Sequence, residues 1–327
     1  MKVKDLKTKK LTEAAMLSAL FVVVSIVAIS TGLMYSIYLD IIVPIFISIL
    51  YLKIGFKYTV ISSLTSLIIV ALAIGDVPSA IWMSQGIILG LICGFFVSKK
   101  GAILDDILWS SIGGCFVVIL VDVYLSTLTG YSLLKDFDSV AVMFPLNEEI
   151  TKMAFYIFVA TIPVGTALVS YVGALFIGHK LNILNKASKE KYNILKNFKK
   201  IGSYLCCSKR TYFISVTYLL IVEIINNTNF TINSTYIKTV IMSVRVVFMY
   251  FIIKDSIGFI RKYIYIRSKS ATVAQVVSFA ILYLLIVNIY ITTILLIIGS
   301  VTVNFLLKIR DKEINIVNQY LELEGQK

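Results

Sequence analysis

Charged residues are scarce in this chain. Only 15% of its 327 residues are Asp, Glu, Lys or Arg, whereas 58% are hydrophobic, and the mean hydropathy is +0.90. A water-soluble domain needs more polar surface than this composition supplies. The shortage of charge therefore excludes most soluble classes and predicts a protein whose solvent is largely lipid.

Residues that bind metals are also few. The single histidine, His179, ends an apolar run, where an interfacial side chain is favoured over a metal ligand. The four cysteines show no metal-ligand spacing and suggest no disulfide framework; they are Cys93, Cys115, Cys206 and Cys207. We expect neither a metal site nor a cofactor.

Two enzyme motifs are missing. No GxxxxGK[ST] loop is present, so any ATP-driven work must come from separate subunits. Glu148 and Glu149 are similar to the paired glutamates of CAAX-type intramembrane proteases, but the EExxxR pattern of that family needs Arg where Met153 stands. The sequence therefore predicts that the chain is not an enzyme.

Ten apolar runs can be marked, and crossing a bilayer takes roughly 20 apolar residues per helix. The fold expected is all-α and polytopic, with about ten transmembrane helices and eight as the fallback. Residues 271–307 contain no charge and would form a helix about 55 Å long, so we expect a hairpin near Asn288 to Thr292. Pro44 predicts a kink in the second run. The runs are 11–30, 38–52, 58–74, 79–97, 103–126, 153–178, 212–225, 236–253 and two within 271–307.

The net charge of +13 fits membrane topology better than nucleic-acid binding. With the N-terminus in the cytoplasm, 27 of the 31 Lys and Arg residues fall inside; Lys135, Lys152 and Lys238 fall outside, and Arg245 lies within a span. This asymmetry predicts a multi-pass cell-membrane protein with both termini cytoplasmic, no nucleic-acid partner and a first run that is retained rather than cleaved.

The most polar internal stretch, 182–211, separates a six-helix membrane domain, 1–181, from C-terminal membrane helices and a cytoplasmic tail, 212–327. Its apolar residues recur at helical spacing opposite lysines, which predicts an amphipathic helix on the anionic inner leaflet. A solvated linker without this role is the alternative. The apolar residues are Ile194, Leu195, Phe198, Ile201 and Leu205, and the lysines are Lys191, Lys196, Lys199 and Lys200.

Small residues four apart form two stripes that favour close helix packing. One contains Gly86, Gly90 and Gly94, and the other contains Ser170, Ala174 and Gly178. We expect both stripes to be structural.

Acidic and aromatic residues gather at the expected outer face, where seven acids meet three lysines. Such a surface would concentrate cations, and its aromatic rings could contact a positively charged ring or amine. An ordinary aromatic belt with solvated acids is the alternative. The acids are Asp40, Asp76, Asp122, Asp136, Asp138, Glu148 and Glu149. The predicted binding residues are Tyr35, Tyr38, Asp40, Asp76, Trp82, Gln85, Asp122 and Tyr124.

Glu223 and Arg245 fall inside apolar runs, where an isolated ionised side chain costs several kcal/mol. Their predicted depths are similar, so we expect an intramembrane ion pair. An ion or proton path through the rear helices is the alternative.

The opening segment KKLTEAAMLSAL contains Ala15-x-x-x-Ala19. It resembles the first helix of substrate-binding S components of energy-coupling factor (ECF) transporters, and the order of the six spans in 1–181 is similar to that family. The full chain resembles the YybS-like family of uncharacterised membrane proteins of low-GC Gram-positive bacteria.

The resemblance implies uptake of a small, vitamin-like solute, for which the acidic rim favours a cationic or amine-bearing compound. It also implies that Ala15 and Ala19 dock onto an ECF transmembrane subunit that carries two ATPases. The alternative is a membrane scaffold or regulator that binds partners through its basic linker and has no transport role.

Overall fold

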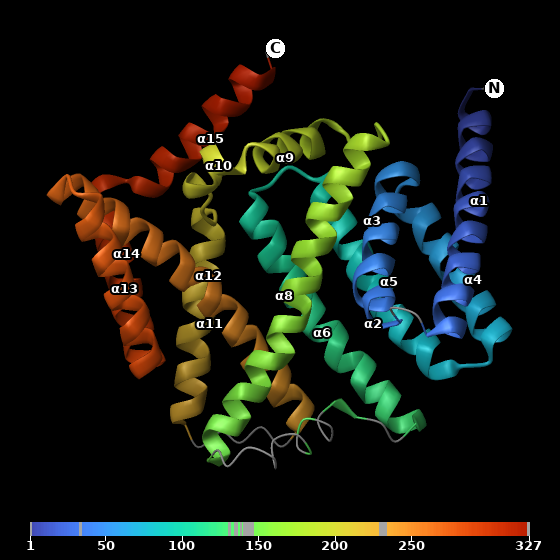
Figure 1. Cartoon of the computed structure of the whole chain (residues 1–327), viewed down its shortest axis with the longest axis horizontal. Coiled ribbons are helices and arrows are strands. Elements are labelled where there is room, and N and C mark those ends of the chain that lie inside the picture. The colour runs from blue at the N-terminus through green and yellow to red at the C-terminus, as the bar shows by residue number, and fades with distance from the viewer. Residues whose placement is uncertain are drawn as a thin grey trace. The chain divides into compact units, whose positions relative to one another are not determined.

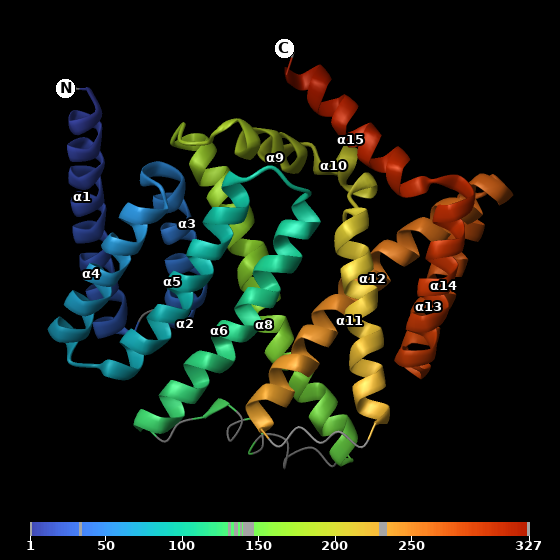
Figure 2. The same cartoon turned by 180° about the vertical axis from the view of Figure 1, so that it is seen from behind.

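The computed structural model describes residues 2–32, 35–129, 132, 133, 137, 139, 147–228 and 234–325. Within these ranges all regular secondary structure is helical (Figures 1 and 2), which confirms the all-α, polytopic prediction. The N-terminal helices are α1 (Lys2–Thr31), α2 (Tyr35–Ile37), a π-helical turn (Tyr38–Ile42), α3 (Val43–Ile54), α4 (Phe56–Ile74), α5 (Val77–Ser98), α6 (Ile103–Thr129) and α8 (Glu148–Lys180). The later ones are α9 (Lys186–Lys196), α10 (Phe198–Ile201), α11 (Lys209–Asn227), α12 (Thr235–Ser268), α13 (Ala271–Val287), α14 (Ile289–Leu307) and α15 (Ile309–Gly325).

Each predicted apolar run coincides with a helix. In the described part, eight helical segments are long and apolar enough to cross a membrane. Helix α11 makes a ninth when it is counted together with the short helical segment Phe198–Tyr204, from which it is bent by 55°. Helix α13, with 17 residues, is apolar but shorter.

The helix break predicted near Asn288 to Thr292 occurs at Asn288. This residue has extended backbone angles, and its side-chain oxygen accepts a hydrogen bond from the N–H of Ile291 at 3.1 Å. Asn288 thus caps the N-terminus of α14, a position that favours Asn. Helices α13 and α14 pack against each other on either side of this break.

Helix α12 is longer than predicted. The apolar run was expected to end at residue 253, but the helix continues to Ser268, for a length of about 51 Å. Two of its lysines after 253 find partners: Lys254 bonds the carbonyl of Leu205, and Lys262 pairs with Glu313. Partners distant in sequence therefore allow a helix where the charges indicated a loop.

The chain divides into two compact units. The first contains Met1–Gly101, Trp109–Tyr192 and Ser234–Ser243; the second contains Ala102–Leu108, Asn193–Asn233 and Val244–Lys327. The polar stretch 182–211 is thus divided between them, because most of α9 packs on the first unit. The Ser188 hydroxyl donates to the carbonyl of Val97 at 2.9 Å.

The expected single amphipathic helix is wrong in two respects. Asn197 separates α9 from α10, and Lys191 is buried rather than on the polar face. The Lys191 ammonium donates to the carbonyls of Phe96 at 2.7 Å and Lys99 at 2.5 Å. These carbonyls lie at the C-terminal end of α5, where the helix dipole favours a cation.

The first glycine stripe brings α5 against α3 and the turn before it. A Cβ atom at Gly86, Gly90 or Gly94 would lie 2.6 Å from an atom of the facing segment, which in the first two cases is a backbone oxygen. Only glycine permits this approach, so the packing prediction is confirmed. In the second stripe, Ser170 and Ala174 are fully buried.

Candidate solute-binding site

A pocket of about 110 Å³ lies within the first unit, where the π-helical turn meets α5, α6 and α8. At roughly 10–15 Å³ per water molecule on this measure, it has room for several waters or a small organic group. Four of the eight predicted binding residues line it. The lining residues are Asp40, Trp82, Gln85, Val118, Val121, Asp122, Leu125, Leu133 and Ile162.

Asp40 lies on the π-helical turn, which closes through a hydrogen bond from the N–H of Val43 to the carbonyl of Tyr38. Pro44 follows, and because it has no N–H it cannot bond the Asp40 carbonyl four residues earlier. Such π turns are rare in proteins, and those that occur are often found at functional sites. The Asp40 carboxylate accepts a hydrogen bond from Trp82 Nε1 at 3.1 Å. The distortion at Pro44 and the glycine stripe of α5 together place these two side chains in contact.

Asp122 is the second carboxylate of the pocket. Its side chain is buried on α6, and one oxygen accepts the N–H of Leu133 at 2.7 Å. The other oxygen is 3.4 Å from the Ser132 hydroxyl. These bonds hold the carboxylate in position.

Gln85 lies one helical turn beyond Trp82 and faces the same side of α5. It is only 7% exposed, and it makes no hydrogen bond with any residue in the described ranges. The amide atoms keep some accessible surface in the pocket, so water or a bound ligand can hydrogen-bond them.

Tyr35 and Asp76 form a network beside the pocket without lining it. The hydroxyl of Ser79 bonds the carboxylate of Asp76 and lies 2.7 Å from the Tyr35 hydroxyl. The Tyr35 ring meets Trp82 edge-on, with centroids 6.2 Å apart. This network supports the indole that contacts Asp40.

Tyr38 and Tyr124 lie elsewhere. Tyr38 is buried, and its hydroxyl is 2.5 Å from that of Ser25. Tyr124 is 58% exposed and is not a lining residue, because two residues along a helix turn the side chain about 200° away from Asp122. Of the other predicted acids, Asp136, Asp138 and the side chains of Glu148 and Glu149 lie outside the described residues.

The sequence did not predict which apolar residues line the pocket, because nothing local distinguishes a valine or leucine that lines a pocket from one that faces lipid. One signal was present. Val118, Val121, Asp122 and Leu125 follow the i, i+3, i+4, i+7 spacing of a single helix face. An acid on that face marks it as turned toward the protein rather than toward lipid.

The remaining predicted residues lie outside the pocket. Ala15 and Ala19 are exposed on α1, whereas the neighbouring Ala14 is buried. In the second unit, Arg245 donates to Glu223 at 2.5 Å and its guanidinium lies 4.7 Å from the centre of the Tyr290 ring. The Arg245 side chain is 11% exposed and that of Glu223 is 48% exposed.

Within the described ranges, no group of three or more His, Cys, Asp or Glu side chains could hold a metal ion. His179 stacks on Tyr192 with ring centres 3.9 Å apart. No family model, curated protein or solved structure matches the chain.

Proposed function

We propose that the first unit is a membrane-embedded binding protein for a small cationic or amine-bearing solute, held in the pocket between Asp40 and Asp122. The observation that carries this proposal is Gln85, whose amide faces the pocket, hydrogen-bonds no described residue and lies beside two carboxylates and an indole. An amide in this position can orient a polar solute.

The charge of the lining favours a cation. Two carboxylates line the pocket, and among the lining residues that the structure describes none is Lys, Arg or His. An anion would meet like charges in a poorly solvated space, whereas a cation would be attracted by both acids. Trp82 offers a ring face for cation–π contact.

We propose further that this binding serves uptake through an ECF-type module, with the chain in a bacterial cell membrane and both termini cytoplasmic. The resemblance of the first six spans to S components supports this role. So does the exposure of Ala15 and Ala19, because small residues on an outward helix face allow another helix to approach closely. The ATPases would be separate subunits.

The binding proposal is tested by mass spectrometry of small molecules released from the purified full chain. We expect a copurifying cation whose retention is lost in Asp40→Asn, Asp122→Asn and Gln85→Leu. The matched control is Tyr124→Leu, which changes an exposed side chain of α6 outside the pocket. An anionic compound, or a cation retained by all three pocket variants, would refute the assignment.

The uptake proposal is tested by coexpression with an ECF transmembrane subunit and its ATPases. Replacing Ala15 and Ala19 by Leu should abolish copurification of the ATPases, whereas Ala73→Leu, at an exposed position of α4, should not. If the unmodified chain recovers no ATPase, the scaffold or regulator role is favoured instead.

A further inference from the structure

A pocket of about 170 Å³ lies within the second unit, beside the second half of α12. Three cations of this helix line it, namely Lys254, Arg261 and Lys262. The segment from Gly202 to Cys206 and Glu313 of α15 complete most of the remaining wall. The sequence assigned these charges only a role in topology.

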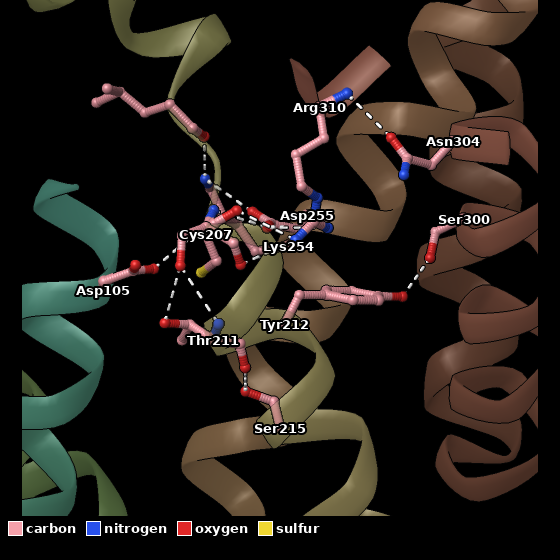
Figure 3. Close-up of polar contacts among 12 residues, drawn as sticks. Asp105, Cys207, Thr211, Tyr212, Ser215, Lys254, Asp255, Ser300, Asn304 and Arg310 are labelled. Atoms are coloured by element: carbon pink, nitrogen blue, oxygen red, sulfur yellow. Dashed lines mark hydrogen bonds and ion pairs between the residues drawn. The ribbon is translucent and has the colours of Figure 1, made fainter. Parts of the chain in front are cut away.

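Asp255 also lines the pocket, but its charge is already compensated (Figure 3). Its carboxylate accepts the backbone N–H of Cys207 at 2.9 Å and lies 3.4 Å from the Lys254 ammonium and 3.8 Å from the Arg310 guanidinium. The side chain is 1% exposed. These partners compensate the charge of the Asp255 carboxylate, which therefore repels a bound anion only weakly.

Arg310 is the buried cationic partner of Asp255. It is 3% exposed, and one nitrogen donates to the carbonyls of Cys207 at 3.1 Å and Ser208 at 3.3 Å. The guanidinium also lies 4.1 Å from the centre of the Tyr212 ring. A buried arginine held in this way supplies Asp255 with a permanent positive partner.

Glu313, the second acid of the pocket, is paired with the Lys262 ammonium, and its side chain is 5% exposed. Burial raises the pKa of Glu313, while Lys262 acts in the opposite direction. The two acids of the pocket thus have their own cationic partners.

The cations retain unused donors. Lys254 also bonds the carbonyl of Leu205 at 2.6 Å, and Lys262 bonds that of Ser203 at 2.5 Å, so each ammonium has one of its three N–H groups left. Arg261 is exposed and has no hydrogen bond or ion pair with a described residue. Among the described lining residues, three cations against two acids give a formal charge of +1.

We propose that this pocket binds a phosphate group, presented either by the headgroup of an anionic phospholipid or by free inorganic phosphate. A guanidinium fork with two ammonium groups suits the tetrahedral arrangement of phosphate oxygens. The apolar side chain of Ile266, near the end of α12, is 59% exposed, as expected of a surface that meets lipid. The site is independent of the solute pocket of the first unit.

The test uses the purified, delipidated full chain in neutral detergent. Binding is measured by native mass spectrometry and by thermal stabilisation with phosphatidylglycerol, with phosphatidylcholine and with inorganic phosphate. We expect phosphatidylglycerol or inorganic phosphate to bind more tightly than phosphatidylcholine. Preference for phosphatidylglycerol over inorganic phosphate identifies the lipid source, and comparable binding of inorganic phosphate alone identifies the free anion.

Arg261→Gln should weaken this binding roughly tenfold, because a charge-assisted hydrogen bond is lost. Its side chain is exposed and pairs with no described residue, so folding should be unaffected. The double variant Lys262→Gln/Glu313→Gln, which removes a cation without stranding its partner, should weaken binding as well. Arg267→Gln, exposed on the same helix outside the pocket, is the matched control and should bind as the unmodified chain does.

Three results would overturn the proposal. Binding of neither phosphatidylglycerol nor inorganic phosphate above the level of phosphatidylcholine would exclude the site. Unchanged binding in Arg261→Gln would remove the pocket as the location. An equal loss in Arg261→Gln and Arg267→Gln would indicate diffuse attraction to a basic surface.

Discussion

Replacing Gly90 by Ala tests whether the contact between α3 and α5 builds the solute pocket. The added Cβ would lie 2.6 Å from the Pro44 carbonyl oxygen and 2.7 Å from the Ile47 Cβ. Ordinary contacts of these kinds need about 3.3–4 Å, so the helices must separate by roughly an ångström. The atom that is met first is backbone, which cannot rotate away.

We expect Gly90→Ala to lose about 1–3 kcal/mol of stability, the usual cost of overpacking a helix contact. The same displacement would stretch the bond of 3.1 Å between Trp82 and Asp40 and should reduce solute retention. The assay is thermal unfolding of the purified chain in detergent, combined with the measurement of released solute.

Gly165→Ala is the matched control, because a Cβ on this helical glycine of α8 would meet nothing within 4 Å. Removal of a helical glycine should leave stability unchanged or raise it by about 0.5–1 kcal/mol. If Gly90→Ala is as stable as Gly165→Ala and retains solute, the reasoning about the glycine stripe is refuted.

Three further predictions concern the rear helices and the topology. Glu223→Gln should destabilise the protein by about 3 kcal/mol, because it leaves the more buried Arg245 without its carboxylate partner. The double variant Glu223→Gln/Arg245→Gln should lose less stability, as measured by unfolding midpoints in detergent. A double variant as unstable as the single one would contradict the ion pair. Burial raises the pKa of the Cys206 thiol to about 12, so at pH 8 its thiolate is roughly a thousandfold rarer than that of an ordinary cysteine. Maleimide should therefore label Cys206 far more slowly than a cysteine introduced by Arg267→Cys. Equal labelling rates would show that the thiol is not held protonated. An impermeant thiol reagent applied to intact cells should label Ser234→Cys and spare Lys199→Cys, and the reverse pattern would invert the proposed topology.

Features set by local sequence were predictable. Each of the ten apolar runs lies in a helical segment, the absence of charge in 271–307 required a break, and Asn288 is a good cap at that break. The packing role of the stripe through Gly90 followed from residue size alone. These features depend on neighbours along the chain.

Features that depend on distant partners were not predictable. Lys191 was assigned to the polar face of a helix because nothing local reveals the carbonyls of Phe96 and Lys99. The extension of α12 beyond residue 253 likewise depends on contacts with remote residues such as Glu313. For the solute pocket, composition indicated which acids and aromatic residues could bind a cation. Only the structure shows that Asp122 lines the pocket whereas Tyr124, on another face of α6, does not.

The central claim is that the pocket around Gln85 selects cations, and this can be measured without knowing the solute. Gln85→Cys is reacted with a small cationic and a small anionic methanethiosulfonate, and both rates are divided by those at Tyr124→Cys. The four native cysteines are buried and contribute little background. We predict a normalised preference of about 10- to 1,000-fold for the cationic reagent, which falls sharply when Asp40 and Asp122 are replaced by Asn. Equal rates, or faster reaction with the anionic reagent, would contradict the account.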